Sequence, residues 1–138
     1  MPIPTELFLS HSDLDREFAA ALGEVLERHG VPYWYSRRNL RGAQEWHDEI
    51  GAALARCDWF LVVLSPASVE SIWVRRELHY ALRVARYEGH ILPVLHRPCD
   101  IERLSWTPPG FQIIDFTADF EHGCRELVRS WNLGYAKT

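Results

Sequence analysis

One glutamate on an expected helix is the residue of this chain best suited by its surroundings to do chemistry. Glu77 lies in the stretch SIWVRREL, where Trp73 and Val74 precede it and Tyr80 and Ala81 follow it at the spacing of helical neighbours. A carboxylate on a hydrated helix face usually has a basic residue at one of these positions. Glu77 is therefore either an ordinary surface residue or a carboxylate that the helix presents to a bound molecule.

A lone carboxylate suits only some reactions. Acid/base cleavage of glycosides needs two carboxylates. One carboxylate can stabilise a ribosyl oxocarbenium ion if the leaving group is already good, as nicotinamide is when it departs neutral from the cationic pyridinium of NAD. Trp73 and Tyr80 would partly desolvate Glu77 and strengthen that electrostatic contact.

Short apolar segments alternate with longer amphipathic ones along the chain, which indicates a parallel sheet with helices on both faces. The expected strands are residues 6–10, 31–35, 58–65, 90–96 and 111–116. The expected helices are residues 13–29, 45–56 and 69–87, and a last one striped by Phe120, Cys124, Leu127, Val128 and Trp131. We predict an α/β fold, a flavodoxin-like three-layer sandwich whose five-stranded parallel sheet has the order 2-1-3-4-5. The chain is expected to be one domain, residues 1–138, with a core from about 6 to 131.

Local signals refine these expectations. Ser12 is expected to cap the first helix and Gly30 to end it, with Leu14 on the core-facing stripe of that helix. Pro32 near the start of the second strand indicates an edge strand. The continuous apolar run of the third strand is typical of a central strand covered on both faces.

The predicted sheet order also predicts where a ligand would bind. In such a sheet, ligands bind beyond the carboxyl ends of strands one and three. Those ends are Ser10-His11-Ser12-Asp13 and Ser65-Pro66. The helix after strand three carries Glu77, so we expect Glu77 to border the same crevice.

Other chemistries of α/β proteins lack their essential residues here. The sequence contains neither GxGxxG nor GxxxxGK[ST], which argues against dinucleotide and P-loop sites. A phosphoryl receiver would need an acid at the end of strand three and a lysine at the end of strand five, where Leu64-Ser65 and Phe116-Thr117 stand. The seven histidines are scattered without HExxH, so no metal site is expected, and no serine lies in a GxSxG elbow.

Composition limits the partners and the compartment. A formal net charge of -4 argues against a dedicated nucleic-acid binder. Three cysteines without CxxC spacing indicate reduced thiols. The start MPIPTELFLSHS lacks the pattern of a signal peptide, and the longest apolar run, residues 59–64, is too short to span a bilayer. We therefore expect a cytoplasmic protein without a membrane partner.

The stretch SRRNLRG (residues 36–42) holds three arginines. It is interpreted either as a solvated turn or as a loop that contacts phosphate or a partner.

Three stretches resemble the sequence boxes of Toll/interleukin-1 receptor (TIR) domains of the kind found in bacterial defence proteins. LFLSHSDLD is similar to the first box, and SRRNLRGAQEWHDEI is similar to the second box and its loop. DWFLVVLSPASVESIWVRREL is similar to a strand ending in Ser followed by S-x-W-x-x-x-E-L. The resemblance covers residues 6–131, with Asn39 and Arg41 standing where many members have Asp and Pro.

The resemblance implies a function and assigns roles to residues. Many such domains hydrolyse or cyclise NAD+, which is a substrate and not a cofactor. The family's catalytic glutamate falls on Glu77 and its preceding aromatic on Trp73. The residues implied to line the nucleotide pocket are Ser10, His11, Ser12 and Asp13. The second-box loop, which contacts a neighbouring domain or closes over the site, contributes Arg38, Leu40, Arg41 and Gly42.

The function expected from all of this is an NAD+ glycohydrolase that is activated by self-assembly, in bacterial defence signalling. We expect homo-oligomer contacts through the 36–43 loop and a sensor domain or subunit outside this chain. The alternative is a non-catalytic TIR module that only recruits other TIR domains. A deoxyribosyltransferase would want a more elaborate acidic site. The sequence leaves open whether water or the substrate's adenine attacks, and so whether the product is linear or cyclic.

Overall fold

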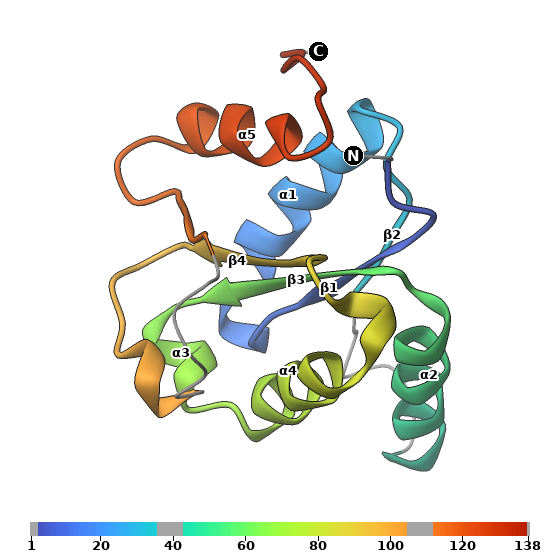
Figure 1. Ribbon diagram of the computed structural model, residues 1–138. Coiled ribbons are helices and arrows are strands. Elements are labelled where there is room, and N and C mark those ends of the chain that lie inside the picture. The colour runs from blue at the N-terminus through green and yellow to red at the C-terminus, as the bar shows by residue number, and fades with distance from the viewer. Residues whose placement is uncertain (1–2, 36–42, 105–111, 138) are drawn as a thin grey trace.

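The computed structural model describes residues 3–35, 43–104 and 112–137, with the backbone alone for residues 43–46. Its centre is a five-stranded parallel sheet in the order β2-β1-β3-β4-β5 (Figure 1). The strands are β1 (Leu7–Ser10), β2 (Tyr33–Tyr35), β3 (Trp59–Leu64), β4 (Ile91–Leu95) and β5 (Ile114–Asp115). This order confirms the predicted topology, including the edge position of β2 and the central position of β3.

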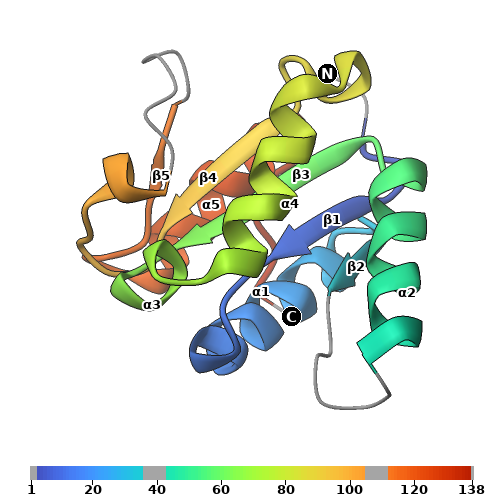
Figure 2. The ribbon, with the colours of Figure 1, turned by 90° about the horizontal axis from the view of Figure 1, so that it is seen from below.

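Helices cover both faces of the sheet. They are α1 (Arg16–Arg28), α2 (Ala43–Arg56), α3 (Pro66–Val69), α4 (Ile72–Arg83) and α5 (Phe120–Arg129), with 3-10 turns η1 (Asp13–Asp15), η2 (Ala85–Tyr87) and η3 (Ile101–Arg103). Helices α1 and α5 lie on one face, and α2 and α4 lie on the other (Figures 1 and 2). The three layers match the predicted architecture.

Successive side chains of each strand point to opposite faces of the sheet, so the core has two halves. Along β3, all six residues are buried. Trp59, Leu61 and Val63 pack on the α1/α5 side, whereas Phe60, Val62 and Leu64 pack on the α2/α4 side. On β1, Leu7 and Leu9 face α1 and α5, and Phe8 faces the opposite helices.

Ser10 follows Phe8 by two residues and therefore points toward the α2/α4 side, the side on which α4 carries Glu77. Strand alternation alone thus directs one serine of the first box toward the candidate carboxylate.

The predicted helix over residues 69–87 is wrong in its extent. The chain instead forms α3, a break at Ser71, the helix α4 and the turn η2. Ser65 caps α3, with Pro66 in its first turn, and Ser71 accepts a hydrogen bond from the Val74 amide to start α4. In a continuous helix the Val74 amide would bond to the carbonyl four residues back, but the Ser71 hydroxyl takes it instead, so the segment restarts at Ile72.

The first helix also begins differently from the prediction. Ser12 does act as a cap, but it caps the 3-10 turn η1, and α1 begins only at Arg16. A 3-10 turn has three residues per turn and shifts the phase of the side chains relative to the α-helix that follows. Leu14, expected in the core, is therefore 86% exposed, and Asp15 is buried in its place.

The end of α1 lies where it was predicted, whereas the last strand differs from the prediction. Gly30, with φ of +72°, follows the C-cap of α1 as predicted, because a residue without Cβ adopts this backbone readily. The last strand is shorter than expected, since only Ile114 and Asp115 pair with β4. Pro93 has no backbone N–H to donate. It lies on β4 opposite Val62 of β3, and the pairing of β4 with β5 begins only at the next residue, Val94, so the missing N–H interrupts no pairing with β5.

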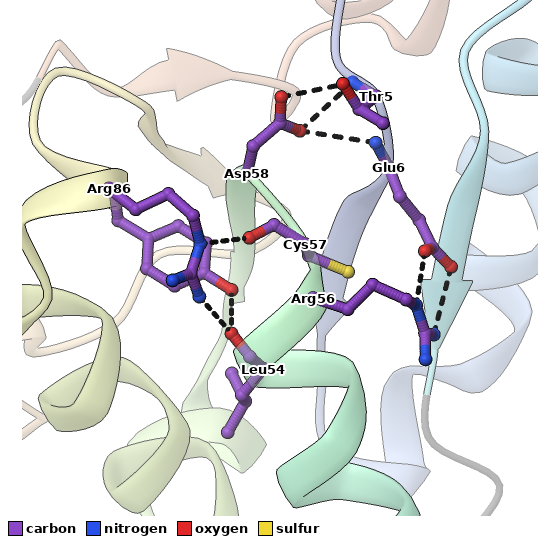
Figure 3. Close-up of polar contacts among 8 residues, drawn as sticks. Thr5, Glu6, Leu54, Arg56, Cys57, Asp58 and Arg86 are labelled. Atoms are coloured by element: carbon purple, nitrogen blue, oxygen red, sulfur yellow. Dashed lines mark hydrogen bonds and ion pairs between the residues drawn. The ribbon is translucent and has the colours of Figure 1, made fainter.

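A polar network ties the amino ends of the strands to the end of α2 (Figure 3). The Asp58 carboxylate accepts hydrogen bonds from the amides of Thr5 and Glu6 at 3.0–3.2 Å. The guanidinium of Arg86 donates to the carbonyls of Leu54 and Cys57 at 2.6 and 2.7 Å. These donors satisfy carbonyl groups at the end of α2 that have no partner within the helix.

Tyr87 completes this network from inside the core. Its side chain is fully buried, and its hydroxyl donates to the Leu54 carbonyl at 2.6 Å. Burial raises the pKa of this hydroxyl to about 12, so it stays a donor throughout the physiological range.

Removing this hydroxyl should measurably destabilise the fold. We expect Tyr87→Phe to lower the free energy of unfolding by about 1 kcal/mol, the usual net contribution of a buried hydrogen bond. Urea denaturation measures the change. The matched control is Tyr135→Phe, whose hydroxyl meets Arg28 at 3.3 Å in a solvent-exposed bond and should change stability by less than about 0.5 kcal/mol. Equal losses in the two variants would contradict a special role for the Tyr87 bond.

Candidate active site at the carboxyl ends of β1 and β3

Glu77 lies on the core-facing stripe of α4. Its neighbours on that stripe, Val74, Leu78 and Ala81, are all buried, and Glu77 itself is only 1% exposed. The spacing i, i+3, i+4, i+7 is that of a helix packed on a sheet. A carboxylate at such a position is costly unless hydrogen bonds satisfy it. Glu77 is thus a buried acid facing the sheet and not an ordinary surface residue.

Ser10 reaches this carboxylate from the last position of β1. The Ser10 hydroxyl donates to Oε1 of Glu77 at 2.6 Å, and Ser10 is fully buried. Hydrogen bonds to a carboxylate are shorter and stronger than those between neutral groups. Figure 2 shows the carboxyl end of β1 next to α4. The structure therefore brings together the two residues that head the predicted site, 67 positions apart in the sequence.

The rest of the first-box loop is built around its own backbone. His11 is 2% exposed, and its Nδ1 lies 2.8 Å from the Ser12 carbonyl, to which it must donate. The His11 ring also lies 5.7 Å from that of Tyr35, on β2. Ser12 accepts from the Leu14 amide, as its capping role predicts. Asp13 is exposed at the start of η1. The binding roles of His11, Ser12 and Asp13 stay predictions.

Trp73 lies one helical turn before Glu77 but at the rim of the site. Its side chain is half-buried, and its ring meets that of His47, on α2, edge-on at 5.8 Å. The Arg76 guanidinium lies 5.3 Å from the centre of the same ring. Trp73 thus contacts a ring on α2 and a cation on its own helix. The predicted residues Arg38, Leu40, Arg41 and Gly42 lie outside the described residues.

The structure adds two polar residues that sequence reasoning missed. The Ser65 hydroxyl, after β3, donates to Oδ2 of Asp15 at 2.5 Å, and the two residues are 1% and 7% exposed. The sequence presents Ser65 only as the residue at the end of a strand, and it gives Asp15 no role in a site. A signal for them existed in the serine that directly follows a central strand and precedes proline, but nothing in the sequence pairs it with Asp15.

A separate hollow of about 410 Å³ lies on the other side of the sheet, against α5. Asp115, His122, Glu126 and Arg129 line it, and Arg129 pairs with Glu126 at 3.3 Å. Its polar groups are on the surface and partly pair with one another. The buried carboxylate of Glu77 is therefore the better candidate centre for chemistry.

Among residues 3–35, 43–104 and 112–137, no three His, Cys, Asp or Glu side chains converge as a metal site requires. No helix in these ranges is both long and apolar enough to cross a bilayer. The three cysteines are free thiols, as expected, and burial raises the pKa of Cys57 to about 12 and that of Cys124 to about 11.

Comparison with known families agrees with this geometry. A family model described as the TIR domain matches residues 7–128, nearly the whole length of the chain. The chain belongs to the TIR domain family.

Curated relatives of this TIR domain carry enzymatic names. The 2′ cyclic ADP-D-ribose synthase BtTIR of Bacteroides thetaiotaomicron is 28% identical over an alignment of 114 residues that covers 78% of this chain and 39% of the relative. NAD(+) hydrolase TcpC of Escherichia coli is 29% identical and NAD(+) hydrolase TcpA of a Theionarchaea archaeon 33% identical, each over 94 residues and 66% of this chain. The matched parts are 31% and 28% of those two proteins, so this TIR domain corresponds to about a third of each relative.

Solved structures share the fold of this TIR domain. The TIR domain of the Toll-related receptor TRR-2 from Hydra magnipapillata superposes with a TM-score of 0.63 at 22% identity, covering 89% of this chain and 87% of that one. A prokaryotic SEFIR domain gives 0.66 at 15% identity, covering 93% and 92%. The TIR domains of the activated Roq1 resistosome give 0.54 at 22% identity, covering 65% and 56%. These likenesses establish the fold alone.

The stability of the TIR domain should reflect the burial of its carboxylate. Replacing Ser10 by alanine and Glu77 by leucine together removes the hydroxyl and the carboxylate of their hydrogen bond and extends the apolar stripe. We expect this double variant to be as stable as the wild type or up to about 2 kcal/mol more stable, because apolar replacement of buried charged groups is often neutral or stabilising. Ser10→Ala alone should destabilise, since it takes a donor from a buried carboxylate. Urea denaturation of the wild type, Ser10→Ala and the double variant measures their free energies of unfolding. A double variant less stable than Ser10→Ala would contradict the expectation.

The pH dependence of stability should carry a contribution from His96, just past β4. Its ring stacks on Phe18 at 4.0 Å, and burial lowers the pKa of His96 from 6.5, partly opposed by the Asp15 carboxylate. The unfolded chain therefore binds a proton at higher pH than the folded chain, and stability falls as the pH drops from about 6.5 toward the folded pKa.

This contribution can be isolated by two variants. His96→Gln should reduce the loss of unfolding free energy between pH 7.5 and 5.5. Asp15→Asn should lower the pKa of His96 further, as followed by NMR titration of the ring, because the opposing carboxylate is gone. A pKa of His96 that rises in Asp15→Asn would show the sign to be wrong.

Proposed function

We propose that this TIR domain cleaves the bond between nicotinamide and ribose in NAD+. The observation that carries the proposal is the Glu77 carboxylate, buried on the core stripe of α4 and held by Ser10 at the carboxyl ends of the strands. The site lies at the switch point of a parallel sheet, where ligands of such folds bind. The enzymatic names of the three relatives support the same assignment.

In the proposed reaction, Glu77 stabilises charge that develops on the ribose. The bond from C1′ to the pyridinium nitrogen breaks, and its electron pair returns to the ring, which leaves as neutral nicotinamide without needing a proton. Positive charge then spreads over C1′ and the ring oxygen of the ribose. A fixed carboxylate in a site of low dielectric stabilises that charge more than it stabilises the already cationic pyridinium of the substrate.

The second step of the proposal completes the balance of atoms. Water adds its oxygen to C1′ and releases a proton, which gives ADP-ribose, or a nucleophile within the substrate closes a cyclic isomer. The names of the relatives include both outcomes, a hydrolase and a cyclic ADP-ribose synthase. The proposal for this TIR domain concerns the cleavage step that the two outcomes share.

We also propose that the active form is an assembly of several copies. Glu77 is 1% exposed in the single chain, so a ribose can reach it only after the side chains that cover it rearrange. Contacts between copies could stabilise that open arrangement, with the 36–43 loop as the predicted contact. A sensor outside this chain and a role in defence signalling stay predictions of the family resemblance.

A non-catalytic interaction module is the second candidate. It is favoured by two large apolar side chains left exposed near the carboxyl ends of the strands, Leu14 at 86% and Ile72 at 51%. An interaction module displays such residues to a partner and has no use for a buried, hydrogen-bonded carboxylate.

The deciding experiment is nicotinamide release from NAD+, followed by chromatography at high protein concentration. We expect release by the wild type and a loss of about 100- to 1000-fold in Glu77→Gln, since an uncharged amide no longer stabilises the cation. The amide oxygen can still accept from Ser10, so circular dichroism should show an intact fold. The matched control is Glu88→Gln, an exposed glutamate just past η2, which should retain full activity.

Each alternative outcome has a definite meaning. Equal release by the wild type and Glu77→Gln would remove Glu77 from the mechanism. An assembled wild type, verified by light scattering, that releases no nicotinamide would favour the interaction module.

A further inference from the structure

We propose that Asp15 and Ser65 form a positioning pair, here called the loop clasp. The clasp fixes the β1–α1 loop (residues 11–15) against the start of α3, which leads into α4, and so holds Glu77 in register with Ser10. The inference rests on the proposed function of Glu77. Their hydrogen bond joins the loop to the end of β3 and does not involve the Glu77 carboxylate, so they are positioning residues and not catalytic ones.

The β1–α1 loop needs a tether because the sheet no longer holds it. Pairing between β1 and β3 ends at Ser10, which lies opposite Val62. β3 continues for two more residues to Leu64, and Ser65 follows directly. The loop therefore leaves the sheet beside a strand that runs past it, and Ser65 lies where a side chain of that strand end can reach η1.

The clasp has the features of a strong hydrogen bond. The Ser65 hydroxyl donates to Oδ2 of Asp15 at 2.5 Å, in the range typical of hydroxyl groups that donate to carboxylates. Both groups are buried, so water competes little for either one. The same Ser65 oxygen accepts from the Ser68 amide at 3.0 Å, which joins the clasp to the capping box of α3.

The contacts continue from α3 to the helix of Glu77. The Ser68 carbonyl accepts from the Ser71 amide at 3.0 Å. The Ser71 hydroxyl accepts from the Val74 amide at 3.3 Å and begins α4. Val74 is one turn before Glu77, whose carboxylate accepts from Ser10 at the start of the loop.

The path is therefore closed. It runs from Glu77 to Ser10, along the loop to Asp15, across to Ser65, and through the two serine caps back to α4. If the Asp15–Ser65 bond is removed, this path is broken. Ser10 on β1 and Glu77 on α4 then lie on elements that can shift relative to each other. A misplacement of about 1 Å far from the chemistry can lower a rate by about 100-fold.

The test combines kinetics and hydrogen exchange on the 138-residue chain. The variants are Asp15→Ala, Ser65→Ala, the double alanine variant and Asp15→Asn. We expect each alanine variant, and the double variant equally, to lower kcat for nicotinamide release by about 10- to 100-fold with little change in KM, because one shared interaction is lost. Asp15→Asn keeps an oxygen that can accept from Ser65 and should give an intermediate kcat.

The double variant separates positioning from stability. Ser65→Ala alone leaves a buried carboxylate without this donor, whereas the double variant removes both groups and should have the higher Tm of the two. Positioning predicts that kcat stays low in the double variant although Tm recovers. A kcat that recovers together with Tm would overturn the proposal.

The matched control is Asp119→Ala. Asp119 also accepts a hydrogen bond near a helix start, from the His122 amide at 3.1 Å, but it caps α5 on the opposite face of the sheet. This variant should lower Tm and leave kcat unchanged.

Hydrogen exchange gives a readout that needs no activity. Loss of the clasp should speed exchange of the interior amides of α4 relative to those of α5, and Asp119→Ala should do the reverse. If the assembled wild type releases no nicotinamide, the proposed function fails and this ratio alone decides the clasp. An unchanged ratio in both Asp15→Ala and Ser65→Ala would overturn it.

Discussion

The hydrogen bond between Ser10 and Glu77 is the contact on which the rest of this structure depends. It places a charged group on the apolar stripe of a helix, where Val74, Leu78 and Ala81 show that the position belongs to the core. Such an arrangement persists only if the strand end and the helix are held at one separation, because a carboxylate without its donor is costly at this depth. The sheet order, the caps of α3 and α4 and the buried loop after β1 all serve that separation.

The topology and the location of the site follow from the sequence because both depend on local periodicity. The apolar run of β3 and the alternation in β1 determine which strands are central and which way each side chain points, so Ser10 must face the side that carries Glu77. The choice of Glu77 itself came from its unusual helical neighbours and from the family resemblance. The topology, the direction of Ser10 and the choice of Glu77 can therefore be predicted without knowing any interatomic distance.

The features that sequence reasoning missed depend on small changes of helical phase. A single 3-10 turn before α1 moves Leu14 out of the core and Asp15 into it, and pattern reading assumes one continuous helix there. Likewise, the Ser71 hydroxyl takes a backbone amide within the expected helix 69–87, and α4 starts afresh at Ile72. The Asp15–Ser65 contact joins residues 50 positions apart and involves the residue that the 3-10 turn buries.

The network at the amino ends of the strands has an evolutionary consequence. Asp58, Arg86 and Tyr87 bind backbone groups at the end of the sheet opposite to the Glu77 crevice. Mutations that strengthen or weaken the fold there are spatially insulated from the residues that would meet a substrate. Stabilising mutations at the amino ends of the strands can therefore offset the stability lost when the loops at the carboxyl ends change to accept new partners or to give a different product.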